Sequence, residues 1–103
     1  PWGGGITTCD ALWMGVPVIT LRGRTAVGRG SVSVLCNLGL PELVAETPRQ
    51  YVELACAWEK WIGLRATMRE RMIASPLLDA QRFSADLAAA FRSMWRNWCL
   101  NTY

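Results

Sequence analysis

The apolar positions along the chain follow two patterns, short continuous runs and repeats at helical spacing. The runs Val18–Leu21 and Leu43–Ala45 are typical of short buried strands. Residues 8–15, which precede the first run, are amphipathic and predict a helix ended by Gly15, because glycine favours the position just after a helix. A strand that follows such a helix is typical of a βαβ unit with parallel pairing. The expected fold class is therefore α/β, helix-rich with a few short parallel strands.

The second half of the chain predicts three helices. The first starts with Thr47 as N-cap, Pro48 at the first helical position and Gln50 at the capping-box position. Apolar residues at helical spacing after this start are expected to form core, in preference to an aromatic ligand site. They are Tyr51, Leu54, Ala55, Trp58 and Ile62.

The other two helices follow Gly63. Leu64, Met68 and Met72 form an apolar stripe that ends at Ser75-Pro76, and Asp79 is placed to cap a long last helix. One face of that last helix is apolar and wide, which indicates docking against more protein than these residues supply. It consists of Phe83, Leu87, Ala90, Phe91, Met94 and Trp98, with Trp95 beside them.

Candidate chemistry begins at the start of the chain, where three glycines at 3–5 run into two threonines and a helix. Glycines allow close approach of the backbone to a ligand, and a helix N-terminus offers free N–H groups to an anion. The spacing of Thr7 and Asp10 also fits a capping box, so a plain loop with a helix cap is the alternative. The residues predicted to hold a nucleotide diphosphate and its ribose are Gly4, Gly5, Thr7, Thr8 and Asp10, with Asp10 on the ribose.

A second glycine-rich loop, Arg22–Gly30, follows the first predicted strand. Ligands of open α/β sheets bind at the carboxyl ends of strands, so this loop is a second candidate. Thr25 is expected to cap a helix that runs to about Cys36. The arginines of the loop could contact phosphate or lie in solvent as ordinary surface side chains.

Composition narrows the function classes. The 103 residues carry a formal net charge of +3. They include no His, which excludes imidazole general bases and His-based metal sites from these residues. The arginines are interleaved with acidic residues, so no nucleic-acid stripe is expected. The 4 cysteines lack a CxxC pair and are expected to be reduced, as in the cytoplasm, and no apolar run is long enough for a membrane span. The start without Met suggests a piece of a longer protein.

Four stretches carry a resemblance to the C-terminal part of the O-GlcNAc transferase and SPINDLY-like glycosyltransferases, and together they cover essentially the whole chain. They are Gly3–Leu21, Gly39–Ala45, Tyr51–Val52, and Arg71–Leu77 with Phe83 and Met94-Trp95 after it.

The resemblance implies a GT-B transferase, in which two Rossmann-like domains hold a nucleotide-sugar between them, usually after tetratricopeptide repeats. Residues 1–76 would be part of the C-terminal Rossmann-like nucleotide-sugar-binding domain, and residues 77–103 its closing helix. The family moves N-acetylglucosamine from UDP, or in some cases fucose from GDP, to Ser or Thr of proteins, with inversion and without a required metal. The implied partners are UDP-GlcNAc or GDP-fucose, protein acceptors, and the N-terminal Rossmann half and repeats of the parent chain.

Carried over position by position, Thr7 matches a Thr of the family's Gly-His-Thr-Thr type diphosphate motif, and Asp10 matches its ribose-binding Asp. The chain has Gly5 in place of the His and Ile6 in place of the first Thr, so the site relies more on backbone N–H groups. Arg22 stands where the family usually has Pro. The leading hypothesis is a donor-binding part of a transferase that is inactive alone. The alternatives are a non-catalytic helical protein-interaction module and a degenerate transferase relative.

Overall fold

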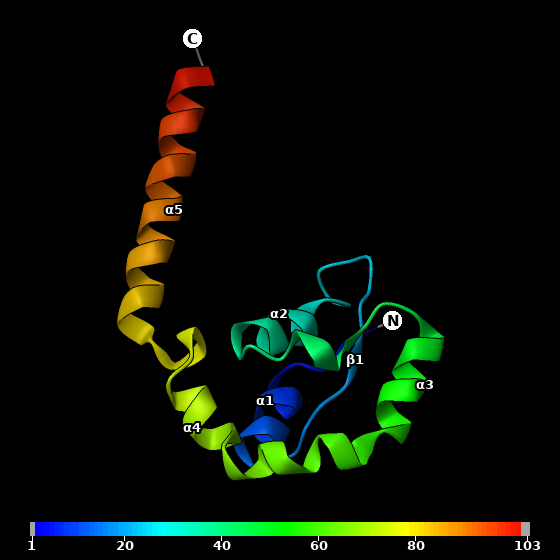
Figure 1. Cartoon of the computed structure of the whole chain (residues 1–103). Coiled ribbons are helices and arrows are strands. Elements are labelled where there is room, and N and C mark those ends of the chain that lie inside the picture. Colours follow the sequence, from blue (N-terminus) through cyan, green and yellow to red (C-terminus); the bar gives the residue numbers. More distant parts are fainter. Residues whose placement is uncertain (1, 102–103) are drawn as a thin grey trace.

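The computed structural model describes residues 2–101, in which helices of varied length surround a pair of very short strands (Figure 1). The α-helices are α1 (Ile6–Trp13), α2 (Gly30–Asn37), α3 (Pro48–Cys56), α4 (Met68–Ile73) and α5 (Ala80–Asn101). The 3-10 helices are η1 (Pro41–Leu43), η2 (Trp58–Lys60), η3 (Ile62–Ala66) and η4 (Pro76–Leu78).

The two strands, β1 (Thr20–Leu21) and β2 (Val44–Ala45), lie within the predicted apolar runs. They pair in parallel, with Thr20 opposite Val44 and Leu21 opposite Ala45. The N–H of Arg22 continues this ladder beyond β1, because it donates to the carbonyl of Ala45 at 2.8 Å. The predicted α/β class, helix-rich with short parallel strands, is confirmed.

The hydrophobic core lies between α1, α2, α4 and the segment that contains η1 and β2. Its buried members are Leu12, Val32, Leu35, Leu38, Leu40, Leu43, Val44, Met68 and Met72. Leu64 is partly buried against this cluster, so the predicted stripe of Leu64, Met68 and Met72 does face the core. The core therefore fixes α1 and α2, the two helices that border the predicted ligand loops.

Glycines end α1 and α2 in the same way. Gly15 and Gly39 have positive φ angles of 78° and 68°, which side chains rarely tolerate. After α1, the N–H of Gly15 donates to Leu12 and the N–H of Val16 donates to Ala11, the paired bonds of a Schellman motif. The prediction that Gly15 ends the first helix is confirmed.

The predicted capping box at the start of α1 is wrong. The helix begins at Ile6, with Gly5 as its N-cap, and Thr7 lies inside the first turn. The carbonyl of Gly5 accepts from the N–H groups of Thr8 and Cys9 at 3.0 and 3.4 Å, so the backbone starts the helix without a side-chain cap. The expected helix start at Thr25 is also wrong, because residues 25–29 form turns and α2 begins only at Gly30.

Thr47 caps α3 as predicted, but the Gln50 side chain accepts from the N–H of Glu46 and not from that of Thr47, so the capping box is incomplete, and the expected core face is wrong. Thr47 Oγ1 accepts from the N–H of Gln50 at 3.2 Å, and Pro48 is the first helical residue. Tyr51, Trp58 and Ile62 are nevertheless exposed, as is Ala55, and only Leu54 of the predicted set is half-buried. The helix ends at Cys56 and continues as 3-10 turns, which removes the periodicity on which that prediction rested.

The long last helix forms where it was predicted and projects away from the rest of the molecule (Figure 1). Asp79 Oδ1 accepts from the N–H of Arg82 at 2.9 Å, which confirms the N-cap. The apolar stripe, from Phe83 to Trp98, stays exposed over the whole helix. The division into residues 1–76 and 77–103 remains a prediction, and Pro1, Thr102 and Tyr103 lie outside the described residues. No helix within residues 2–101 has both the length and the apolar character needed to cross a membrane.

Candidate functional site

The two glycine-rich segments border one open cavity of about 660 Å³ at the carboxyl end of β1. This is the edge of an open α/β sheet at which ligands normally bind. The lining residues are Trp2, Gly3, Gly4, Thr8, the stretch 18–25, Gly28, Ser31 and Tyr51. A cavity of about 740 Å³ lies elsewhere, around η4 and the start of α5, and includes neither glycine segment.

A buried hydrogen-bonded group ties α1 and α2 together at the cavity wall. Ser31 Oγ donates to the carbonyl of Gly4 at 2.8 Å and lies 3.1 Å from Thr8 Oγ1. Since the one hydroxyl proton of Ser31 is used on Gly4, the Thr8 hydroxyl must be the donor in the second bond. Thr8 is only 5% exposed, so in this arrangement its proton holds the wall together and is not offered to a ligand.

Glycine is required at position 4 because Thr8 lies so close. A Cβ added to Gly4 would clash with Thr8 Oγ1, whereas one added to Gly5 would meet nothing within 4 Å. The close approach expected of the glycine segment therefore falls on Gly4.

The second glycine-rich loop folds back against the first. The N–H of Gly3 donates to the carbonyl of Val27, and the N–H of Gly23 donates to that of Gly28, both at 3.0 Å. A Cβ on Gly23 would lie 2.8 Å from the Cα of Gly28, so this turn also needs glycine. The two loops that the sequence indicated separately thus contact each other and border one cavity.

Two helix N-termini and two arginines lie at this cavity. The N-termini of α1 and α2 are joined there by the Ser31 bonds, and helix N-termini favour anions. Within residues 2–101, no carbonyl accepts from the N–H groups of Ile6 and Thr7, which lie next to the lining residues Gly4 and Thr8 but are not themselves part of the lining. Arg22 and Arg24 line the cavity, and none of the lining residues is acidic. The arrangement suits an anionic ligand.

Of the five predicted site residues, the structure brings two to the cavity wall. Gly4 and Thr8 line it, whereas Gly5, Thr7 and Asp10 do not and are exposed on or beside the first turns of α1. The ribose role of Asp10 remains a prediction.

Sequence reasoning missed three contributors to the site. Ser31 was assigned to a helix interior and Tyr51 to the core, and the partner of Arg22 was not identified. Only the position of Arg22 directly after a predicted strand pointed to the cavity.

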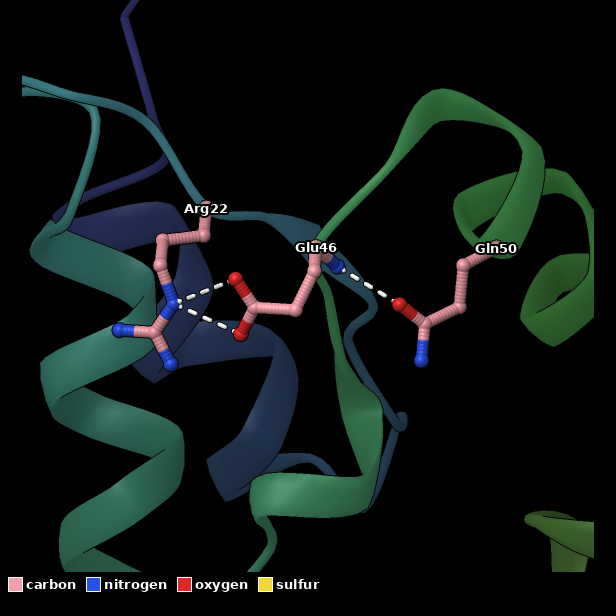
Figure 2. A network of polar contacts seen from close by, with 3 residues as sticks. All are labelled: Arg22, Glu46 and Gln50. Carbon is pink, nitrogen blue, oxygen red and sulfur yellow. Dashed lines mark hydrogen bonds and ion pairs between the residues drawn. The ribbon is translucent and has the colours of Figure 1, made fainter.

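That partner is Glu46, which follows β2 as Arg22 follows β1 (Figure 2). Arg22 Nε donates to Glu46 Oε1 at 2.8 Å and to Oε2 at 3.0 Å. The N–H of Glu46 in turn donates to Gln50 Oε1 on α3 at 2.8 Å. The residue that directly follows β1 is therefore linked to the residue that directly follows β2, and through it to α3.

Metal ligands do not gather in the part of the chain that the structure describes, since no group of three or more His, Cys, Asp or Glu is placed to hold an ion. The absence of a required metal remains a prediction.

Comparison with known proteins gives consistent matches over nearly the whole length. The profile of the family described as Glycosyl transferase family 41 matches residues 2–87. The protein named "Probable UDP-N-acetylglucosamine–peptide N-acetylglucosaminyltransferase SPINDLY" is 41% identical over 103 residues in Hordeum vulgare and 43% in Eustoma exaltatum. Each alignment covers 96% of this chain but 11% of the relative, so the chain spans about a tenth of the relatives' length.

A solved structure agrees with the sequence matches. A mutant O-GlcNAc transferase from Thermobaculum terrenum is 36% identical and superposes with a TM-score of 0.85. The match covers 100% of this chain and 21% of that one.

Proposed function

The chain belongs to glycosyl transferase family 41, and we propose that its two glycine-rich loops bind the diphosphate of a nucleotide-sugar donor. The observation that carries the proposal is the convergence of the α1 and α2 N-termini on one cavity beside Gly4 and Arg22. A diphosphate is the part of such a donor that two helix N-termini would attract.

The proposed roles of the residues differ with their positions. Gly4 permits the close packing of the wall, and Gly5 and Thr7 contribute backbone at the open end of α1. Thr8 fixes the wall through Ser31, and Asp10 accepts hydrogen bonds from the ribose diol. The last role requires that the nucleoside extend along the exposed side of α1.

We propose UDP-GlcNAc as the donor, with GDP-fucose as the alternative, and Ser or Thr of proteins as the acceptor. The names of the plant relatives, which specify UDP-N-acetylglucosamine and a peptide, support this choice. No catalytic residue is assigned within these residues. Their proposed contribution to an inverting transfer is to stabilise charge on the departing diphosphate, with N–H groups oriented before the reaction and without a required metal. Residues 1–103 alone are expected to be inactive.

The test is nucleotide binding by the full-length protein. UDP, GDP and their sugars are titrated into the wild type, into Asp10→Ala, and into Asp86→Ala as a matched loss of an exposed carboxylate on α5. We expect Asp10→Ala to weaken binding at least about tenfold, as for lost hydrogen bonds to a charged group, and Asp86→Ala to have no effect. Unchanged affinity in Asp10→Ala would refute the ribose role, and a wild type without nucleotide affinity would favour the interaction-module alternative.

We also propose that the exposed face of α5 packs against another part of the full-length protein. Six large apolar side chains of this helix, each 41–67% exposed, support the proposal, because a face of this kind usually marks an interface. They are Phe83, Leu87, Phe91, Met94, Trp95 and Trp98. Phe91→Asp is expected to lower the thermal midpoint of the full-length protein, and Arg92→Asp, the next residue, is the control. Equal effects of the two variants would count against packing.

A further inference from the structure

Arg22 is held in the cavity wall by contacts that use only part of its guanidinium group. Its Nε is bonded to both carboxylate oxygens of Glu46, and its side chain is 34% exposed. None of the residues 2–101 accepts a hydrogen bond from either terminal nitrogen of Arg22. Figure 2 shows one terminal nitrogen pointing away from Glu46 and the other below Nε, and neither is joined to Glu46 by a dashed line. Four N–H donors are thus left for a ligand.

The support behind Arg22 is more extensive than that of an ordinary surface ion pair. Its backbone N–H is bonded to Ala45, and Glu46 is bonded through its own N–H to Gln50 of α3. Both ends of the pair are therefore anchored to the strand ladder or to a helix. An exposed ion pair contributes only about 0–1 kcal/mol to stability. Orientation of the guanidinium therefore explains this anchoring better than stabilisation of the fold does.

The carboxylate does not stand in the way of an anion. Arg22 lines the cavity, whereas Glu46 and Gln50 do not. The residues that line the cavity thus include the basic member of this ion pair but not the acidic one. On another part of the same wall, Gly4 and Thr8 mark the N-terminus of α1. The cavity consequently offers two separate places for negative charge.

We infer that Arg22, positioned by Glu46, contacts a phosphate of the ligand and makes the cavity select nucleoside diphosphates over nucleoside monophosphates. A ligand with one phosphate satisfies either the helix N-terminus or the guanidinium, whereas a diphosphate can engage both. The planar guanidinium is well suited to phosphate oxygens because its donors are fixed relative to one another. This inference rests on the proposed donor-diphosphate site and adds to it a residue that determines its specificity.

The test compares UDP, UMP, GDP and GMP binding to the full-length protein by calorimetry. Arg22→Ala is expected to weaken binding of the preferred diphosphate at least about tenfold and that of the corresponding monophosphate less than about twofold. Arg49→Ala is the matched control, because Arg49 also pairs with a glutamate through Nε, at 2.9 Å, but lies outside the cavity. Glu46→Gln should weaken diphosphate binding about threefold without changing monophosphate binding, since the guanidinium keeps its charge but has one neutral amide oxygen in place of two carboxylate oxygens to hold it.

Several outcomes would overturn the inference, and they are distinguishable. If the wild type binds a diphosphate but Arg22→Ala and Arg49→Ala behave alike, Arg22 is only a link between strand ends and the donor site stands. Equal losses for diphosphate and monophosphate would also refute the selectivity. Wild-type affinity in Glu46→Gln would refute the positioning role. Arg22→Gln replaces Arg22→Ala if the alanine variant fails to fold. A wild type that binds no diphosphate would refute the donor site and this inference together.

Discussion

Ser31→Ala is expected to loosen the wall of the proposed donor site. The Ser31 hydroxyl, in a residue only 3% exposed, makes two hydrogen bonds, to the carbonyl of Gly4 and with the hydroxyl of Thr8. The alanine variant loses both and leaves the buried Thr8 hydroxyl without a partner among the described residues. A net hydrogen bond contributes about 0.5–1.5 kcal/mol, and a buried group left unpaired costs about 1–3 kcal/mol. We therefore expect a local destabilisation of about 2 kcal/mol.

Hydrogen exchange of the full-length protein measures this change where it occurs. An opening reaction made about 2 kcal/mol easier exchanges roughly 30-fold faster, so peptides covering α1 and the start of α2 should show that acceleration. Ser84→Ala is the control, because Ser84 Oγ also donates to a backbone carbonyl, that of Ala80 at 2.9 Å, but at an exposed position of α5. Its effect should stay within about 0.5 kcal/mol. Acceleration below about threefold in Ser31→Ala, or as large in Ser84→Ala, would refute the reasoning.

A double-mutant cycle with Thr8→Val separates the two bonds. The Ser31 proton is used on Gly4, so Thr8 should donate to Ser31. In that case the effects of Ser31→Ala and Thr8→Val on stability should be coupled by about 0.5–1.5 kcal/mol. Additive effects within about 0.3 kcal/mol would mean that the Thr8 hydroxyl is independent of Ser31. Its proton would then be available to a phosphate, and the proposed division of roles between Thr8 and the backbone would be wrong.

Three further predictions concern the surroundings of this wall. Gly4→Ala should displace Thr8 at a cost of about 1–3 kcal/mol and weaken diphosphate binding, whereas Gly63→Ala, where a Cβ meets nothing within 4 Å, should leave calorimetric affinity unchanged. Arg69→Ala should lower stability in denaturant melts by about 1 kcal/mol, because Arg69 donates to the carbonyl of Trp13 at 3.2 Å and lies 4.9 Å from its ring centroid. Gly15→Ala should cost about 1 kcal/mol or more in the same melts, since its φ of 78° is unfavourable for alanine and the Cβ would meet Arg65.

Features that depend on neighbouring residues in the sequence could be predicted. The caps by Thr47 and Asp79 and the helix end at Gly15 each involve groups within a few residues of one another. The two strands were also predicted, because short apolar runs between turn residues are typical of buried strands. Such local rules were sufficient for the fold class.

Features that depend on contacts between distant segments could not be predicted. Thr8 meets Ser31 across 23 positions, and Arg22 meets Glu46 across 24. The capping box failed for a different reason, since the Gly5 carbonyl starts the helix before Thr7 and leaves Thr7 inside the first turn. Periodicity likewise grouped Tyr51 with Trp58 on one face, but it carries no information on whether another element covers that face.

The departures of this chain from the family's diphosphate motif lie at the start of α1 and just after β1, and in the proposed donor site they offset one another. With glycine at position 5 and isoleucine at position 6, two side-chain donors expected from the resemblance are absent, and the hydroxyl of Thr8 is engaged by Ser31. If nothing else differed, the anion would be left with backbone N–H groups and the helix dipoles alone. Arg22 adds guanidinium donors at that cavity; its Nε is bonded to Glu46, whose own N–H donates to Gln50. We therefore interpret Ile6 and Arg22 as two parts of one altered phosphate site rather than as signs of a degenerate transferase.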